Sequence, residues 1–438
     1  MEKIQEKYDR ELVVIGIHSA KFPNERSKEN LNNAVRRYEL THPVINDPQF
    51  QIWQQYACRA WPTLMFVSPT GKVVEKHEGE ITYQTLDLVV SRLIDQFDSD
   101  KTIYRSSTFF NQPSTISQDL CYPGKLLSDE GSESLFISDS NHNQILITSL
   151  EGEIQSIVGS GSTGLADGSF TESEFNHPQG LAIKNNKVYV ADTGNHAIRE
   201  IDLGLKTVTT IAGDGSQGSP STDIRQGKSV SLNSPWDITC VADDLFIAMA
   251  GSHQLWCMNL ANHKIGPYAG SGQESLHDGP LATSTLAQPS GITSDTDHLY
   301  FADSETSAIR YANLDPGGNI ETIVGQDLFV FGDVDGDPEH CRLQHPLGIT
   351  YRGKALYIAD TYNHKIKCIN LESRITSTIF GSGKSGAKDG VGTDAEFSEP
   401  SGLSITGDYL YIADTNNHII RKANLSTYQV ITMNIQRP

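Results

Sequence analysis

The sequence predicts a mainly-β protein in which a six-bladed β-propeller follows a small, incomplete α/β domain. Two observations lead to this prediction. After residue 120, one pattern of proline, apolar strands and a polar turn recurs six times, at spacings of 54–57 residues. Before that point, apolar strand-like segments alternate with helix-like segments, as they do in α/β domains.

The N-terminal domain is expected to span residues 1–98. The run Leu12–Ile17 (LVVIGI) is continuously apolar, which is typical of a strand buried on both faces of a sheet. The elements after it follow the order of an α/β sandwich. Helices are predicted at 27–38, 49–57 and 83–97, and strands at 63–67 and 73–77.

Trp61, Pro62 and Thr63 precede an apolar strand and a Pro-x-Gly hairpin, and this segment resembles the second half of a thioredoxin-like domain. The resemblance implies that Pro62 is the cis-proline that borders the family's active site. It also implies that the family's first core strand and its C-x-x-C pair are absent, because Met1 matches a point inside the helix that follows them. Cys58 is then a lone thiol, which we expect to pack rather than to react.

The absent strand has a structural consequence. In the family it lies between the counterparts of Leu12–Ile17 and 63–67, so both strands lose a neighbour and their backbone groups lose hydrogen-bond partners. We therefore expect either that Met1 is an internal start within a longer gene product or that this domain is partly open.

Residues 99–120 are rich in Ser, Thr, Asp and Gln and are predicted to form a polar linker. Part of the segment 102–110 is expected to pair with a blade edge or to pack on the propeller. The propeller itself is expected to span residues 121–438.

Each repeat carries four short strands with apolar residues at alternate positions. Four antiparallel strands repeated six times match a six-bladed propeller. A solenoid is the alternative, but it needs atypical capping repeats at both ends, whereas the last repeat keeps all its strands through residue 433. The repeats begin at Pro123, Pro178, Pro235, Pro289, Pro346 and Pro400.

The turn between the second and third strands reads Asp-x-x-Asn-His-x-Ile in its most regular copies, and this turn resembles the NHL repeat. Asp and Asn tolerate left-handed backbone and bond nearby amides, so a structural role in a tight hairpin is expected. A ring of metal ligands is the alternative. Because these histidines begin the third strand, away from the central channel, they are not expected to converge on an ion at about 2.0–2.1 Å. The signature residues are Asp139, Asp192, Asn195, His196, Asp303, Asp360, Asn363, His364, Asp414, Asn417 and His418.

The third repeat departs most from this pattern. Met249 stands where the other repeats carry aspartate, and the neighbouring loops contain Trp236 and His253. These three residues are the candidate interaction surface, and simple drift of the repeat is an equal alternative. No catalytic, cofactor-binding or metal-ligating residue is predicted: the G-x-G-x-x-G runs close repeats instead of opening a helix, and the cysteines show no zinc spacing.

The composition of the chain disfavours some classes of binding partner. The net charge is −20, from 34 basic and 54 acidic residues, which disfavours binding to phosphate backbones. No stretch approaches the roughly 18 apolar residues of a membrane span, and residues 1–10 are charged, unlike a secretory signal. Six scattered cysteines fit reduced thiols. A monomeric cytoplasmic protein without nucleic-acid or membrane partners is therefore expected.

The order of parts, with segments such as 16–25 (GIHSAKFPNE) and 343–350 (LQHPLGIT), is similar to a family that joins a thioredoxin-like domain to an NHL-repeat propeller. The predicted function is a non-catalytic scaffold that presents loops to protein partners. The alternative is a thiol–disulfide oxidoreductase whose C-x-x-C lies upstream of this chain and whose propeller selects substrates. RNA binding is a third hypothesis, and the acidic balance argues against it.

Overall fold

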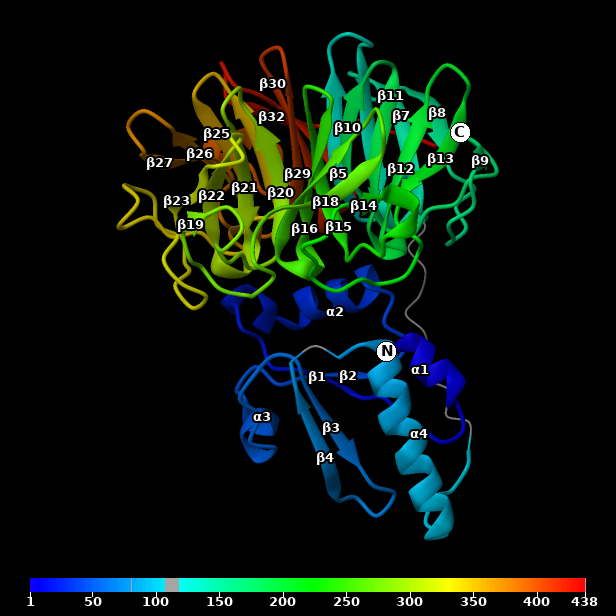
Figure 1. Ribbon diagram of the computed structural model, residues 1–438. Helices are drawn as coiled ribbons and strands as arrows, with labels where there is room; N and C mark the ends of the chain where they lie inside the picture. Colours follow the sequence, from blue (N-terminus) through cyan, green and yellow to red (C-terminus); the bar gives the residue numbers. More distant parts are fainter. Residues whose placement is uncertain (80, 107–117, 438) are drawn as a thin grey trace. The chain divides into compact units, whose positions relative to one another are not determined.

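A computed structural model describes residues 1–79, 81–106 and 118–437 (Figure 1). Contacts between residues divide the chain into two compact units, residues 1–116 and 117–438, which we call the N-terminal unit and the propeller. Residues 107–117, in the middle of the predicted linker 99–120, lie outside the described residues. Part of the segment 102–110, expected to pack on the propeller, lies outside them as well.

The N-terminal unit mixes short helices and short strands. Side-chain caps begin two of its helices: Ser27 Oγ accepts a hydrogen bond from Asn30 N at 3.0 Å, and Thr82 Oγ1 accepts one from Thr85 N at 3.3 Å. The helices are α1 (Glu2–Lys7), the 3-10 turn η1 (Pro23–Arg26), α2 (Lys28–Arg37), α3 (Gln51–Gln55) and α4 (Tyr83–Ser99). The strands are β1 (Gly16–His18), β2 (Val44–Asn46), β3 (Thr63–Val67) and β4 (Val73–Glu78).

Helix α4 supplies much of the core of this unit. Leu86, Val90 and Leu93 recur at helical spacing and are buried. Leu86 and Val90 pack with Ile4 of α1, and Leu64 of β3 packs against the same cluster. One face of the β3–β4 pair is therefore covered by helices.

The predicted strand Leu12–Ile17 differs from the observed one. Only Gly16–His18 forms a strand, and the side chains of Val13, Ile15 and Ile17 are 50%, 55% and 41% exposed. Strand β1 pairs in parallel with β2, and β3 pairs antiparallel with β4, each in a sheet of two strands. The prediction of burial on both faces was wrong because burial requires neighbouring strands, and β1 has one.

The propeller consists of six antiparallel sheets, and the prediction of a mainly-β six-bladed propeller is confirmed (Figure 1). Strands of each blade pair in sequence order. Blade 1 contains β5 (Pro123–Asp129), β6 (Ser134–Asp139), β7 (Gln144–Ser149) and β8 (Ile154–Val158). Blade 2 contains β10 (Pro178–Lys184), β11 (Lys187–Asp192), β12 (Ala197–Asp202) and β13 (Thr207–Ala212). Blade 3 contains β15 (Pro235–Val241), β16 (Asp244–Met249), β17 (Gln254–Asn259) and β18 (Lys264–Ala269).

The other three blades repeat this plan. Blade 4 contains β20 (Pro289–Ser294), β21 (His298–Asp303), β22 (Ala308–Asn313) and β23 (Asn319–Val324). Blade 5 contains β24 (Gly348–Arg352), β25 (Ala355–Asp360), β26 (Lys365–Asn370) and β27 (Thr376–Phe380). Blade 6 contains β29 (Pro400–Thr406), β30 (Tyr409–Asp414), β31 (Ile419–Asn424) and β32 (Gln429–Thr432). Two-residue strands extend blades 2, 3, 4 and 6: β9 (Gly168–Ser169), β14 (Arg225–Gln226), β19 (Gly279–Pro280) and β28 (Gly390–Val391).

The first strand of each blade lies innermost and touches the first strand of the next blade. These contacts run from β5 through β10, β15, β20, β24 and β29 and return to β5, so the ring is closed. Apolar clusters fill the seams. Phe136 and Ile145 of blade 1, for example, pack with Leu181 and Val188 of blade 2. Every blade therefore buries its two faces against neighbours.

No helix among the residues described is long and apolar enough to cross a membrane.

Candidate functional site

The repeated aspartate is the centre of a buried polar network in each regular blade. Asp192 ends β11 and is fully buried. Its Oδ1 accepts a hydrogen bond from Asn176 N at 2.8 Å, and its Oδ2 accepts bonds from Asn195 Nδ2 at 2.8 Å and Arg199 Nη1 at 2.9 Å. Burial raises the pKa of Asp192 to about 6, against the opposing effect of the Arg199 charge. The carboxylate thus ties the turn, the loop before the blade and the third strand together.

A buried cation follows the aspartate by seven residues, and this partner was missed in the sequence prediction. It lies on the third strand, where Arg199 faces Val190 across the β11–β12 ladder. The spacing between the two residues was a readable signal, because a basic residue stands at that position in four repeats. The other pairs are Arg310 with Asp303 at 2.8 Å, Lys367 with Asp360 at 3.3 Å and Arg421 with Asp414 at 3.0 Å.

Signature histidines link each blade to the next. His196 has left-handed backbone (φ 50°), and its Nδ1 accepts a hydrogen bond from Ser234 N of blade 3 at 3.1 Å. Because Nδ1 accepts, the ring is neutral with its proton on Nε2. The same bond joins Gln288 N to His253, Glu399 N to His364 and Tyr122 N to His418, at 3.0–3.1 Å.

The two remaining seams use other acceptors at the same position. Asn143 Oδ1 accepts from His177 N at 3.0 Å, and Ser307 Oγ accepts from His345 N at 3.1 Å. Six side chains therefore connect six seams, and His418 closes the ring onto blade 1. Within the described parts of the chain, no group of three or more His, Cys, Asp or Glu side chains is arranged to hold a metal ion.

The third blade replaces the ion pair with an apolar pair. Met249 occupies the aspartate position and Trp256 the cation position, and they are 0% and 1% exposed. Both belong to one apolar cluster. Met249 therefore cannot contact a partner, which corrects its place in the candidate interaction surface: the departure from the repeat is a change of packing. His253 forms the seam bond described above, and Trp236 is half-buried.

An ion pair spans the centre of the propeller. Lys125 of β5 and Asp237 of β15 lie 3.2 Å apart (Nζ to Oδ2), with side chains 4% and 13% exposed. Lys125 Nζ also donates to Leu347 O, and Asp237 Oδ2 accepts from Ile292 N at 3.2 Å. Burial lowers the pKa of Lys125 and raises the pKa of Asp237. Groups from four blades therefore meet at this pair. The pair is not part of the repeat pattern, so the sequence does not predict it.

The N-terminal unit holds an aromatic group and a shallow pocket. The Trp61–Pro62 peptide bond is cis, and Trp61 Nε1 donates to Ser19 O at 2.8 Å. The rings of Trp61 and Trp53 lie 4.4 Å apart. Burial raises the pKa of the Cys58 thiol, so the thiolate needed for disulfide chemistry is disfavoured.

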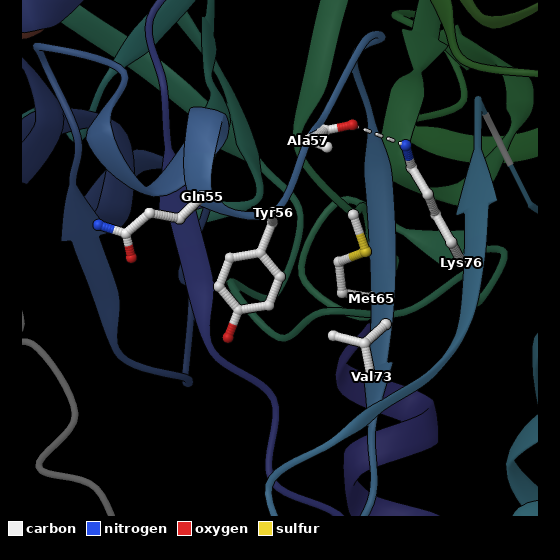
Figure 2. A pocket seen from close by; sticks show the side chains of 6 residues that line it. All are labelled: Gln55, Tyr56, Ala57, Met65, Val73 and Lys76. Carbon is white, nitrogen blue, oxygen red and sulfur yellow. Dashed lines mark hydrogen bonds between the residues drawn. The ribbon is translucent and has the colours of Figure 1, made fainter.

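Figure 2 shows the pocket, of about 400 Å³, at the end of α3 and on the β3–β4 sheet. Tyr56, Met65 and Val73 give it an apolar lining. Lys76 stands at its edge and donates to Ala57 O at 3.0 Å. This lining suits an apolar side chain of a partner better than a charged small molecule. The full lining is Gln55, Tyr56, Ala57, Met65, Val73 and Lys76.

Family comparisons agree with the blade geometry. The model of the NHL repeat matches residues 175–201, at the start of blade 2, and the model of the LVIVD repeat matches residues 400–420 in blade 6. A solved structure of a protein of unknown function from Bacteroides thetaiotaomicron has a TM-score of 0.53 at 16% identity, covering 73% of this chain and 72% of that one. The chain is thus a six-bladed β-propeller that contains a match to the NHL repeat in blade 2.

Its relatives extend the match to the N-terminal unit. NHL repeat-containing protein 2 from Gallus gallus is 39% identical over 98% of this chain and 64% of its own length, and that from Homo sapiens is 38% identical over 97% and 64%. Protein SUPPRESSOR OF QUENCHING 1, chloroplastic, from Arabidopsis thaliana is 42% identical over 97% of this chain and 42% of its own length. The chain is thus homologous to NHL repeat-containing protein 2 over nearly its whole length, and it spans at most 64% of these relatives.

Proposed function

We propose that this chain is a protein-interaction scaffold whose N-terminal unit carries the contact surface. The observation that carries the proposal is the distribution of exposed apolar side chains. Among the described residues, fourteen large exposed apolar residues lie in the N-terminal unit and nine lie in the much longer propeller. Clustered exposed apolar surface marks interaction sites in soluble proteins.

Two strands present this surface together. Ile17 of β1 faces Ile45 of β2 in the parallel register, and they are 41% and 44% exposed. Ile15 and Val13, which precede β1, are exposed at alternate positions. A row of this kind on a strand with an open edge is suited to a partner that adds a strand. The propeller then serves as a rigid platform, since its signature residues are engaged in bonds within and between blades.

We further propose that the N-terminal unit is a thioredoxin-like fragment without redox activity. Its order of elements, with a parallel β1–β2 pair, an antiparallel β3–β4 hairpin and the final helix α4, supports this assignment. The raised pKa of the Cys58 thiol supports the lack of activity. Residues 1–98, 99–120 and 121–438 remain the proposed domain limits.

A thiol–disulfide oxidoreductase is the second candidate, with its C-x-x-C upstream of this chain. The open edges of β1 and β3 favour it, because a further strand bearing a cysteine pair fits there. Insulin reduction by this chain tests the first candidate, because the second places its reactive cysteine pair outside the chain. The scaffold proposal expects no reduction above background by this chain, and turnover abolished by Cys58→Ser would contradict it.

The scaffold is tested by affinity capture with the full chain, followed by titration of the captured protein. Replacing Ile17 and Ile45 by Asp should weaken binding at least about tenfold, since charges in an apolar contact are desolvated at a cost. Leu205→Asp is the matched control, because Leu205 is 75% exposed on the propeller. Equal losses in both variants, or no loss in either, would contradict a contact surface on β1 and β2.

The remaining expectations concern partners and location. We propose a monomer that binds protein and neither nucleic acid nor membrane, in keeping with the net charge of −20. The name of one relative places it in the chloroplast, so the cytoplasmic location expected from the sequence stays a prediction.

A further inference from the structure

Blade 1 lacks the buried cation of the regular blades. Its aspartate, Asp139, is fully buried, and Asp139 Oδ1 accepts a hydrogen bond from Cys121 N at 2.6 Å, as the aspartates of blades 2, 4, 5 and 6 accept from the equivalent backbone N. The residue seven positions later is Leu146, which is also fully buried and apolar. The third strand of this blade therefore supplies no charge to Asp139.

Arg437, near the C-terminus, occupies that place instead. Its Nη2 lies 2.5 Å from Asp139 Oδ2, and its Nη1 donates to Gln144 Oε1 at 2.8 Å. Two further bonds hold Arg437 to the residue that leads into blade 1: Arg437 N donates to Asp119 Oδ1 at 3.0 Å, and Nε donates to Asp119 O at 2.7 Å. The ion pair thus joins residues 298 positions apart in the sequence.

The residues before Arg437 are packed into the same seam. Met433 and Ile435 are each 7% exposed and belong to a cluster that includes Leu146 of blade 1 and Ile420 of blade 6. Gly152, in the hairpin between β7 and β8, leaves room for this segment. A Cβ added at Gly152 would lie 2.9 Å from Asn434 O.

The seam between blades 6 and 1 is also where the chain must close the ring. All strands of blade 1 fall within 123–158 and all strands of blade 6 within 390–432, so among the described strands none is shared by the two blades. Beyond the contact between β29 and β5, closure depends on side chains and on residues 433–437, which follow blade 6. We infer that residues 433–437 form a clasp, with Arg437 as its anchor, that holds the propeller ring closed.

Hydrogen–deuterium exchange of the full chain, resolved by peptide, tests the clasp. Arg437→Met should accelerate exchange in blades 1 and 6 on the order of tenfold, because a charged hydrogen-bonded pair is lost there. Arg199→Met is the matched control, since it removes the same kind of pair inside blade 2. The control should accelerate exchange in blade 2 and leave the seam between blades 6 and 1 unchanged.

A second variant displaces the clasp without removing its charge. Gly152→Ala brings a Cβ against Asn434 O and should also accelerate exchange at this seam. Gly407→Ala, at another positive-φ glycine (53°) with nothing within 4 Å of the added Cβ, controls for backbone strain. Unchanged exchange in Arg437→Met and Gly152→Ala, or acceleration spread evenly over all six blades, would overturn the clasp.

Discussion

The histidine at each regular turn acts as a hydrogen-bond acceptor between blades. This role requires a neutral imidazole, because a protonated ring has no lone pair left at Nδ1. His364 shows the consequence most clearly. It is 6% exposed, and burial lowers its pKa, with Glu399 acting in the opposite direction. Asn143, which makes the same bond in blade 1, performs the task without titrating.

Stability should therefore depend on the protonation of His364. Since its folded pKa lies below the unfolded value of 6.5, the unfolded chain binds the proton first as the pH falls. The free energy of unfolding should then decrease below about pH 6.5, by about 1 kcal/mol for the seam bond. His364→Asn should remove this part of the loss. Thermal unfolding of both chains from about pH 7.5 to about pH 5.5 measures the difference.

Comparing the two chains at each pH isolates the histidine, because the buried aspartates titrate in the opposite sense. Asp192 and Asp414 have pKa values raised to about 6, so their contribution to stability is lost as the pH rises through that value. Identical pH profiles for wild type and His364→Asn would contradict the acceptor role.

At the scale of one blade, the third repeat shows that two positions change together. Met249 and Trp256 replace an aspartate and a cation that contact each other in blades 2, 4, 5 and 6. An apolar pair of similar volume can substitute for a buried ion pair, whereas a mixture of one charged and one apolar residue leaves a buried charge without its partner. Met249 and Trp256 are both apolar, so the two positions of blade 3 leave no buried charge without a partner.

Met249→Asp alone should destabilise the chain by about 3–5 kcal/mol, since it buries a carboxylate without a partner. Met249→Asp combined with Trp256→Arg should recover at least about half of that loss. Denaturant unfolding of the two single variants and the double variant gives the coupling. Additive losses would show that the two positions are independent.

A structural feature can be predicted from the sequence when the residues that determine it lie close together along the chain. The prolines and the Asp-x-x-Asn-His turns are local, so the sequence predicts six blades of four strands each, as observed. The Asp192–Arg199 pair could also have been predicted, because both residues lie in one hairpin. Arg437 was not, since its partner lies at the other end of the propeller. The burial of Leu12–Ile17 failed for a related reason: an apolar run shows strand character but not how many strands flank it.

Across the whole propeller, the pair Lys125–Asp237 connects blades that are not adjacent in sequence. It links β5 to β15 directly and reaches β20 and the residue before β24 through backbone groups. Gly180 on β10 leaves space for it, because a Cβ there would lie 2.4 Å from Asp237 Cα. Four blades therefore bond within this contact, and blade 2 makes room for it.

Lys125→Met should cost about 3–5 kcal/mol, because the buried Asp237 carboxyl would lose its charged partner. Lys125→Met with Asp237→Asn should be the more stable of the two variants, as the amide oxygen still accepts from Ile292 N. Calorimetry of both variants measures the difference. A double variant less stable than Lys125→Met would show that the charge on Asp237 is held by other groups.

The Lys125–Asp237 ion pair also bears on whether a molecule can pass along the axis of the propeller. The buried side chains of Lys125 and Asp237 join the innermost strands of blades 1 and 3, so we expect them to hinder passage of a metabolite or an extended peptide along the axis. We therefore expect ligands of the propeller to be recognised at its rims or outer strands, and each of its two broad sides to bind independently of the other. Coupling between the two sides would then require a movement of the blades that this ion pair joins.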